Sequence, residues 1–314
     1  MQPQLDPSLY YLSNFHKALA WLRERHLDLL LAEEQGFLRL FGELALPSQA
    51  LLVRMIMRKG VHFRASKLTY AEIGCPRHAA QALLDAGWIR NDAELALAEL
   101  FDLLRKEELL EAFDARAHKA LKKPELLARL AAEHGQSRPF AAWCPGLDEQ
   151  VYSLAIDPLC ERLRLMFFGN LQQDWSEFVL AELGIFRYEP VALSADSRVF
   201  RRRAEVDCYL ALQRCRERGE AGEPIAEVLQ QIAALDCATP FLAMRRAKLL
   251  FRLGQYLERA GELESALACY ADCPFAGARL RRIRVLERLG RAAEAHALAS
   301  QAAAAPENEA EAQG

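Results

Sequence analysis

Apolar residues recur at spacings of three and four along almost the whole chain, which is the period of an amphipathic helix. The segment FHKALAWLRERHLDLLLAEE, at residues 15–34, shows the pattern plainly. Glycines fall mostly between such segments, and alternating strand patterns are short, at residues 67–73 and 88–90. The chain of 314 residues is therefore predicted to be mainly α-helical, with room for two or three domains.

Residues 48–92 have the pattern of a winged helix-turn-helix. Ser48 is placed to cap a helix that runs to Lys59 and ends at a glycine. A second helix is bounded by the proline and the glycine of residues 76–87, and Trp88 then begins an apolar strand, as the wing would. Such units place one helix in a DNA groove. The alternative is a small α/β module with a solvated basic helix.

Residues 100–131 are predicted to form two leucine-rich helices with a break before Lys122, Lys123 and Pro124. A leucine-rich helix, a short basic connection and a second leucine-rich helix are typical of a SAP motif, a small module that binds the DNA backbone. An ordinary helical hairpin is the alternative. Together with the winged helix, this segment makes residues 1–140 the predicted DNA-binding region.

The last third of the chain contains an internal repeat. Residues 256–268 align with residues 285–297 at a fixed offset of 29. Small residues and a closing proline indicate degenerate tetratricopeptide-like units, although the period is shorter than the usual ~34 residues. We predict such repeats over residues 237–300, preceded by a helical region at 141–236 and followed by a linker or tail at 301–314.

Three windows lack acidic residues, although acids outnumber bases 43 to 40 in the whole chain. They are residues 44–71, 237–257 and 273–286, and each contains at least four cations. Basic windows on separate elements indicate a long polyanion that crosses several of them. Residues 197–203 add a basic cluster at a predicted helix start, where cations oppose the helix dipole and an external anion could compensate them. A solvated face is the alternative there.

Several classes of function find no support in the residues. The eight cysteines form no C-x-x-C pair, the seven histidines have no metal-ligand spacing, and no nucleophile–base constellation stands out. No acid lies two residues before any lysine, so a (D/E)-x-K motif is missing. The N-terminus has no basic region followed by an apolar stretch, and no apolar run approaches the ~18 residues that span a bilayer. We expect a cytoplasmic protein that binds no membrane.

Residues 10–73 resemble the start of the Fanconi-associated nucleases, structure-specific DNA repair nucleases with a VRR-type nuclease domain. The residues that carry the resemblance are Tyr10-Tyr11-Leu12 with Asn14-Phe15, Val53-Arg54 with Arg58-Lys59, and Lys67-Leu68 with Tyr70 and Glu72-Ile73. The order of the predicted parts also fits this family. The resemblance implies a bacterial member that cleaves near 5′ flaps, acts as a 5′→3′ exonuclease of the phosphodiesterase I class and serves in interstrand crosslink repair.

The family's chemistry belongs to a C-terminal PD-(D/E)xK domain that holds Mg²⁺ or Mn²⁺. Because that motif is missing here, we expect this chain to be the N-terminal non-catalytic portion, with the nuclease domain outside it. The implied partners are duplex DNA near 5′ flaps or branches and the protein's own nuclease domain. The implied location is the cytoplasm, with association to the nucleoid when DNA is bound.

The resemblance and the basic windows together give two sets of candidate site residues. The candidate DNA-binding residues are Tyr10, Tyr11, Arg54, Arg58, Lys59, Arg64, Lys67, Tyr70, Lys122 and Lys123. The family's animal members hold a 5′ phosphate in a basic pocket on the repeat helices. The candidate phosphate-binding residues are Arg201, Arg202, Arg245, Arg246, Lys248, Arg279 and Arg282. No catalytic residue and no metal ligand is predicted.

Two other functions fit the same pattern. A winged-helix transcription regulator would bind one DNA sequence rather than one DNA shape. A protein-interaction scaffold would bind no DNA at physiological salt, since its basic windows would be merely solvated.

Overall fold

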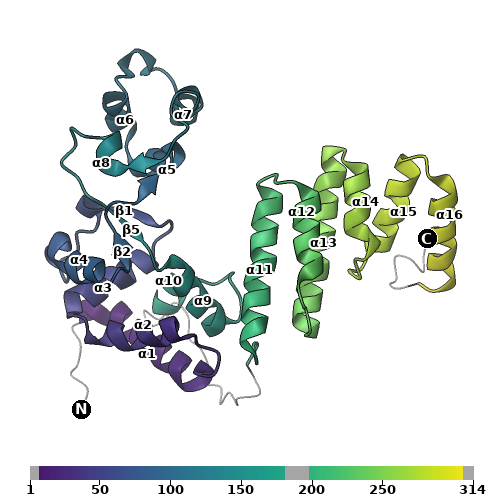
Figure 1. Cartoon of the computed structure of the whole chain (residues 1–314), viewed down its shortest axis with the longest axis horizontal. Helices are drawn as coiled ribbons and strands as arrows, with labels where there is room; N and C mark the ends of the chain where they lie inside the picture. The colour runs from purple at the N-terminus through teal and green to yellow at the C-terminus, as the bar shows by residue number, and fades with distance from the viewer. Residues whose placement is uncertain (1–6, 181–197, 307–314) are drawn as a thin grey trace. The chain divides into compact units, whose positions relative to one another are not determined.

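The computed structural model describes residues 7–180 and 198–306, which divide into two compact units (Figure 1). Unit 1 ends at Val199 and unit 2 begins at Phe200. The domain boundaries predicted from the sequence were at residues 140 and 236 instead. The difference arises because strand β5, Val151–Leu154, lies beyond residue 140 yet pairs with strands that precede it. The mainly α-helical prediction is confirmed.

The first part of unit 1 packs helices around a small antiparallel sheet of order β1-β5-β2. The strands β1 and β2 are His62–Arg64 and Ile89–Arg90. The surrounding elements are η1 Pro7–Leu9, α1 Tyr10–His26, α2 Ala32–Glu43, α3 Leu46–Ile56, η2 Ala65–Lys67, α4 Pro76–Asp85, α9 Asp157–Phe168 and α10 Trp175–Leu180. In the core, the buried Phe15 ring lies 5.3 Å from Phe41 and 5.2 Å from Trp175, joining α1, α2 and α10.

The winged-helix prediction is right about its second helix and about a strand directly after Trp88. It is wrong about the bounds of its first helix, which ends at Ile56 and not at Lys59, about the extended piece and about the wing hairpin. The second predicted helix is confirmed as α4, but α3 begins at Leu46, before Ser48, because Pro47 suits its first turn. The strand lies at His62–Arg64, ahead of the extended piece expected at 67–73. The strand Ile89–Arg90 forms no hairpin with its neighbour, because Ile89 pairs with Leu154 of β5.

The second part of unit 1 is a small helical subdomain on a two-stranded sheet. The strands β3, Glu94–Leu95, and β4, Arg138–Pro139, are antiparallel. The helices are α5 Leu97–Leu103, α6 Lys106–Ala112, η3 Arg116–His118, α7 Lys123–Ala131 and α8 Phe140–Trp143. Buried Leu100, Leu126 and Trp143 share one core, and the Trp143 indole donates to the Leu95 carbonyl at 2.9 Å.

The first of the two helices predicted within 100–131 is broken at Leu104. The cause is a glutamate three residues into the next helix. Glu108 accepts a hydrogen bond from the Arg105 backbone amide at 2.7 Å and so starts α6 anew. Glu125 does the same for Lys122 at 2.7 Å and starts α7, where Pro124 occupies the first turn.

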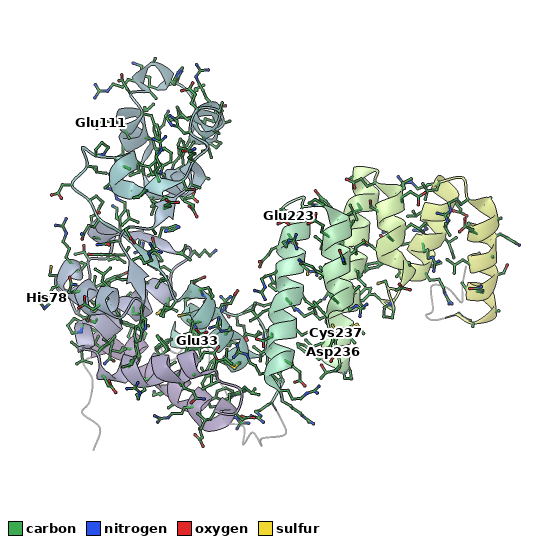
Figure 2. All side chains as sticks on the ribbon, in the orientation of Figure 1. Glu33, His78, Glu111, Glu223, Asp236 and Cys237 are labelled. Carbon is green, nitrogen blue, oxygen red and sulfur yellow. The ribbon has the colours of Figure 1, made fainter. Side chains whose placement is uncertain are left out.

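Unit 2 is a row of helices in which most pack against the next along the chain (Figure 1). The helices are α11 Arg203–Glu220, α12 Ile225–Ala234, α13 Pro240–Ala260, α14 Leu263–Ala271, α15 Ala278–Arg288 and α16 Ala292–Ala304. Their side chains fill the spaces between neighbours (Figure 2). Helix α11 also packs against α13.

The internal repeat corresponds to two helix–turn–helix pairs, α13–α14 and α15–α16. Equivalent glycines, Gly261 and Gly290, join the helices of each pair with φ of +83° and +74°, which glycine adopts without strain. Helix α16 continues to Ala304 with Ala302 buried, so the predicted tail begins later than residue 301. Alanine is the best helix former, which explains the extension. Residues 307–314 of that tail lie outside the described residues.

Candidate nucleic-acid interface

Three exposed cations gather where helix α3 passes into strand β1. Arg58 and Lys59 lie in the turn after α3, and Lys67 ends η2. Arg58 donates to the Lys67 carbonyl at 3.0 Å, and its guanidinium lies 5.6 Å from the Phe63 ring centre. None of the three makes an ion pair with any residue of 7–180 or 198–306. This cluster, here called the α3–β1 cations, is an unneutralised surface that suits phosphate contact.

Arg54 is half-buried and ion-paired, so it is not part of this exposed cluster. Its guanidinium lies between two aromatic rings, 4.0 Å from the Tyr11 centre and 4.6 Å from the Tyr70 centre. It donates to Glu72 at 2.6 and 3.2 Å, and the Tyr11 hydroxyl donates to the same carboxylate oxygen at 3.1 Å. Burial opposes ionisation of Glu72, but these bonds outweigh it and lower its pKa. The group therefore ties α1 and α3 to the loop before α4.

Tyr11 does not reach the surface, so its predicted role in DNA contact is wrong. The side chain is 0% exposed, and burial raises the pKa of its hydroxyl. Tyr10 is half-buried and meets the Tyr11 ring edge-on at 5.9 Å. Tyr70 is half-buried on the other side of Arg54. Of the pair at 10 and 11, only Tyr10 keeps access to solvent.

Arg64 is a second predicted DNA-binding residue that folding withdraws from the surface. It donates to Glu108 at 2.8 Å and to Glu149 at 3.0 Å, and its side chain is 10% exposed. Glu149 also accepts bonds from Ser66. The ion pairs join β1 to α6 and to the segment before β5, so Arg64 connects the two parts of unit 1.

The two lysines at the start of α7 differ in availability. The Lys122 side chain is exposed. Lys123 is half-buried, and its ammonium donates to the Leu104 carbonyl at 2.9 Å. That carbonyl closes α5, so Lys123 satisfies a helix C-terminus. The sequence did not single out Lys106. Its ammonium donates to the Lys119 carbonyl at 2.6 Å, at the C-terminus of η3.

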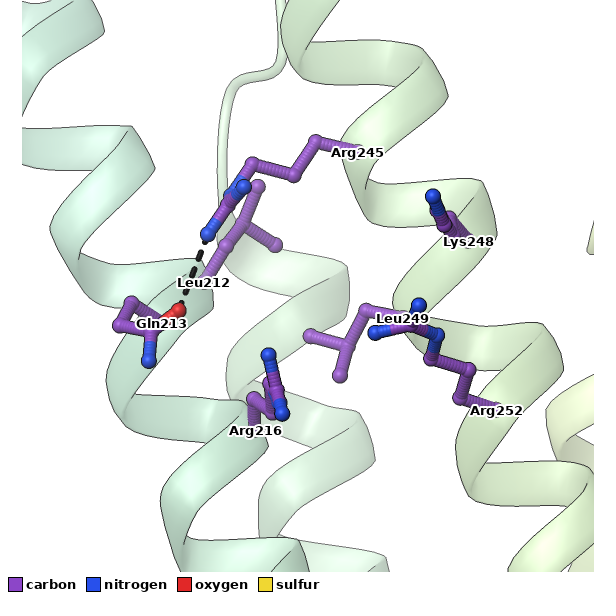
Figure 3. A pocket seen from close by; sticks show the side chains of 7 residues that line it. All are labelled: Leu212, Gln213, Arg216, Arg245, Lys248, Leu249 and Arg252. Carbon is purple, nitrogen blue, oxygen red and sulfur yellow. Dashed lines mark hydrogen bonds between the residues drawn. The ribbon is translucent and has the colours of Figure 1, made fainter. Parts of the chain in front are cut away.

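Unit 2 contains a cationic pocket between helices α11 and α13 (Figure 3). Its volume is about 50 Å³, and its lining residues are Leu212, Gln213, Arg216, Arg245, Lys248, Leu249 and Arg252. Four of the seven are cations and none is an acid. Arg245 donates to Gln213 at 2.9 Å. Burial, with repulsion from Arg216 and Arg252, lowers the pKa of Arg245, so the pocket favours an anion that would relieve this repulsion.

An aromatic stack flanks this pocket. The Tyr209 ring lies beneath the Arg245 guanidinium, which is 3.6 Å from its centre. Phe241 stacks on Tyr209 with centres 6.1 Å apart and an interplanar angle of 17°, and Phe200 meets both rings edge-on. Phe241 remains 44% exposed and Met244 58% exposed. Aromatic faces beside a basic groove are the usual platform for nucleic-acid bases.

The structure brings together only part of the predicted phosphate-binding set. Arg245 and Lys248 share the pocket, whereas half-buried Arg246 is not among its lining residues. Arg202 pairs with Glu205 at 3.1 Å, and that carboxylate also accepts the Arg201 backbone amide at 2.7 Å. The sequence suggested that an external anion compensates the cations at the start of α11. The Glu205 carboxylate supplies that negative charge from within the chain.

The two candidates on α15 also point elsewhere. Arg279 donates to the Ala305 carbonyl at 2.7 Å, and Arg282 donates to the Ala271 carbonyl at 3.4 Å. The pocket instead gains Arg252, which lay in a basic window, and Arg216, which the sequence missed. Arg216 is in RCRERGE, where acids alternate with bases, so no acid-free window marked it. Its helical spacing of three and seven from Gln213 and Tyr209 was the available signal.

Neither a metal cluster nor a membrane span is found in the part of the chain that the structure describes. Within residues 7–180 and 198–306, no three histidine, cysteine or acidic side chains are grouped to hold an ion. Over the same residues, no helix combines the length and the apolar character needed to cross a bilayer.

Comparison with family models identifies both parts of unit 1. Residues 9–90, from the start of α1 to β2, match the model described as FAN1, HTH domain. Residues 94–143, from β3 to α8, match the Fanconi anemia-associated nuclease SAP domain. The two matches follow the division between the sheet-bearing part and the small subdomain.

Several known proteins are similar to the chain. The Fanconi-associated nuclease 1 homolog of Pseudomonas aeruginosa is 51% identical over 313 residues, covering 99% of this chain and 56% of that protein. The homolog of Oryza sativa is 30% identical over 62% of this chain and 22% of its own length. A crystal structure of paFAN1 bound to 2nt 5′ flap DNA with a gap superposes with a TM-score of 0.92, at 51% identity, over 99% of this chain and 57% of that one. The chain thus spans about half the length of the Pseudomonas homolog and of the crystallised paFAN1 chain.

Proposed function

The chain belongs to the Fanconi-associated nuclease family, and we propose that it forms the DNA-binding and scaffold portion of a structure-specific DNA repair nuclease. The observation that supports this most is the likeness, over 99% of the chain at 51% identity, to a protein crystallised on 5′ flap DNA. The unneutralised α3–β1 cations supply the physical basis, because exposed cations without acidic partners attract phosphates.

In this proposal the whole protein is a 5′-flap endonuclease and 5′→3′ exonuclease that acts in interstrand crosslink repair. Its PD-(D/E)xK nuclease domain lies outside this chain and supplies the Mg²⁺ or Mn²⁺ chemistry, because no acid lies two residues before any lysine of this sequence. That nuclease domain is also the chain's nearest partner. The protein works in the cytoplasm and joins the nucleoid when it binds DNA.

Unit 1 and unit 2 contribute differently. The α3–β1 cations and Lys122 contact the phosphates of a duplex, which positions the DNA without reading its sequence. The pocket between α11 and α13 takes a phosphate near a strand end, held by Arg216, Arg245 and Lys248. The remaining helices of unit 2, proposed as tetratricopeptide-like repeats, hold that pocket on a rigid row of packed elements.

Fluorescence anisotropy of this chain tests the proposal. The ligands are a 5′-flap duplex, a blunt duplex and a single strand, each made in two unrelated sequences. Tighter binding to the flap in both sequences supports a shape-specific repair scaffold. A preference for one sequence irrespective of shape would indicate a transcription regulator instead. Equally weak binding of all three ligands at physiological salt would contradict DNA binding by this chain.

A further inference from the structure

Two cysteines of unit 2 lie in direct contact. The Cys208 and Cys237 sulfur atoms are 3.5 Å apart, although the residues are separated by 29 positions. Cys208 is on α11 and is 6% exposed. Cys237 is half-buried in the connection between α12 and α13 (Figure 2). No other two of the eight cysteine sulfurs, all of which the structure describes, approach within bonding distance of each other.

We propose that Cys208 and Cys237 form an oxidation-sensitive pair that closes into a disulfide joining α11 to the start of α13. The sulfurs have to approach from 3.5 Å to the roughly 2.05 Å of a disulfide. Both thiols are free in the structure. Because cytosolic disulfides are mostly transient and redox-sensing, a contact of this kind in a DNA-binding unit is a candidate regulatory site.

The chemistry needs hydrogen peroxide as the oxidant. The more accessible Cys237 thiol attacks the peroxide O–O bond, which yields a sulfenic acid and one water. The Cys208 sulfur then attacks the sulfenic sulfur, forms the S–S bond and releases the second water. The two thiols together lose two electrons and two protons, and the peroxide gains them.

The environments of the two sulfurs fit these separate roles. Cys208 is 6% exposed, so an oxidant in solution reaches its sulfur poorly. Its position against Cys237 makes it the second reactant. The half-buried Cys237 is the one that a small peroxide can reach.

The disulfide would connect two walls of the cationic pocket. Cys208 precedes Tyr209, whose ring supports Arg245 at 3.6 Å. Cys237 lies two residues before Thr239, which caps α13 by accepting the Leu242 amide at 3.3 Å. Drawing the sulfurs together displaces Tyr209 relative to α13, so we expect oxidation to weaken anion binding in the pocket. This last consequence rests on the proposed function, whereas the disulfide itself does not.

Peptide mapping of the full chain tests the disulfide. Reduced protein is treated with limiting hydrogen peroxide, the remaining thiols are alkylated, and a tryptic digest is analysed without reductant. The expected product links residues 204–214 to residues 219–245, each of which contains one cysteine. Cys237→Ser should abolish it. Cys273→Ser, which removes another half-buried thiol, should leave it intact. Absence of this cross-link while other cysteines are oxidised would overturn the proposal.

Two further readouts separate this proposal from the proposed function. Thermal unfolding reports the cross-link without DNA: the oxidised chain should unfold at a higher temperature, and a reductant or Cys237→Ser should remove the shift. Anisotropy with a 5′-phosphorylated single strand reports the pocket: oxidation should lower affinity in the wild type and not in Cys237→Ser. A cross-link that forms without changing this affinity would overturn regulation of the pocket, and failure of the wild type to bind any DNA would overturn the proposed function alone.

Discussion

The Arg54 guanidinium donates to the Glu72 carboxylate at 2.6 Å and thereby neutralises one of the five cations in the longest acid-free window of the chain. Glu72 is the first acid after that window. The Tyr11 and Tyr70 rings enclose the pair, and the Tyr11 hydroxyl shares the same carboxylate oxygen. Together with the ion pairs of Arg64, this relationship makes part of a basic sequence structural. Arg58, Lys59 and Lys67 remain exposed.

Glu72→Ala should destabilise the chain by about 1–3 kcal/mol, because it leaves a partly buried guanidinium and a buried hydroxyl without their acceptor. The measurement is the free energy of unfolding from a urea titration. Glu43→Ala is the matched control: it removes the exposed pair with Arg39 and should cost less than about 1 kcal/mol. Equal effects of the two substitutions would mean that the Arg54–Glu72 pair has no structural role.

The Arg64 network should make stability depend on pH. The hydrogen bond from Arg64, against the effect of burial, holds the pKa of Glu108 below its usual 4.5. Burial would raise the pKa of Glu149, but the bonds from Ser66 and Arg64 lower it. Groups with a depressed folded pKa stabilise the protein above the unfolded value, and this contribution is lost as pH falls through the folded pKa.

Arg64→Gln should therefore lower the free energy of unfolding at pH 7, and its deficit relative to the wild type should shrink as pH falls below 4.5. Urea titrations of both proteins between pH 7 and pH 3 provide the test. A deficit that stays constant over this range would show that Arg64 stabilises unit 1 by packing rather than by its ion pairs.

Arg245→Gln should remove discrimination between a 5′-phosphorylated and a 5′-hydroxyl single strand. The pocket loses a half-buried cation, and a charge-assisted hydrogen bond of this kind is worth roughly a factor of ten in affinity. Anisotropy with the two oligonucleotides measures the ratio. Arg284→Gln, an exposed arginine of α15, is the control and should keep the wild-type ratio. Loss of discrimination in both variants would point to general charge rather than to the pocket.

Gly254→Ala should destabilise unit 2 even though alanine favours helices. A Cβ atom at this position would lie 2.5 Å from the Tyr270 ring, whose hydroxyl donates to Glu258 and resists displacement. Overpacking of this kind costs about 1–3 kcal/mol. Gly36→Ala in α2 meets no atom within 4 Å and should instead stabilise by about 0.5–1 kcal/mol. Thermal unfolding of both variants decides, and stabilisation by Gly254→Ala would contradict the close approach of α13 and α14.

Local patterns predicted the helices and the order of the parts because amphipathic periods, glycines and prolines act over a few residues. They could not predict strand β5, since the pairing of Phe63 with Tyr152 joins residues 89 positions apart. The same limit explains the site. Arg58 and Arg64 lie in one acid-free window, but folding brings Glu108 and Glu149 to Arg64 and no acid to Arg58. A window free of acids therefore identified candidates and could not tell structural cations from available ones.

The salt dependence of binding tests the central claim most directly. A variant with Arg58→Gln, Lys59→Gln and Lys67→Gln is compared with the wild type and with Arg39→Gln, which changes an exposed arginine of α2. Each phosphate contact contributes about −0.9 to the slope of log affinity against log salt concentration. We predict that the triple variant binds a 5′-flap duplex with a slope shallower by roughly 2–3, while Arg39→Gln keeps the wild-type slope. An unchanged slope in the triple variant would contradict the assignment of the α3–β1 cations to DNA.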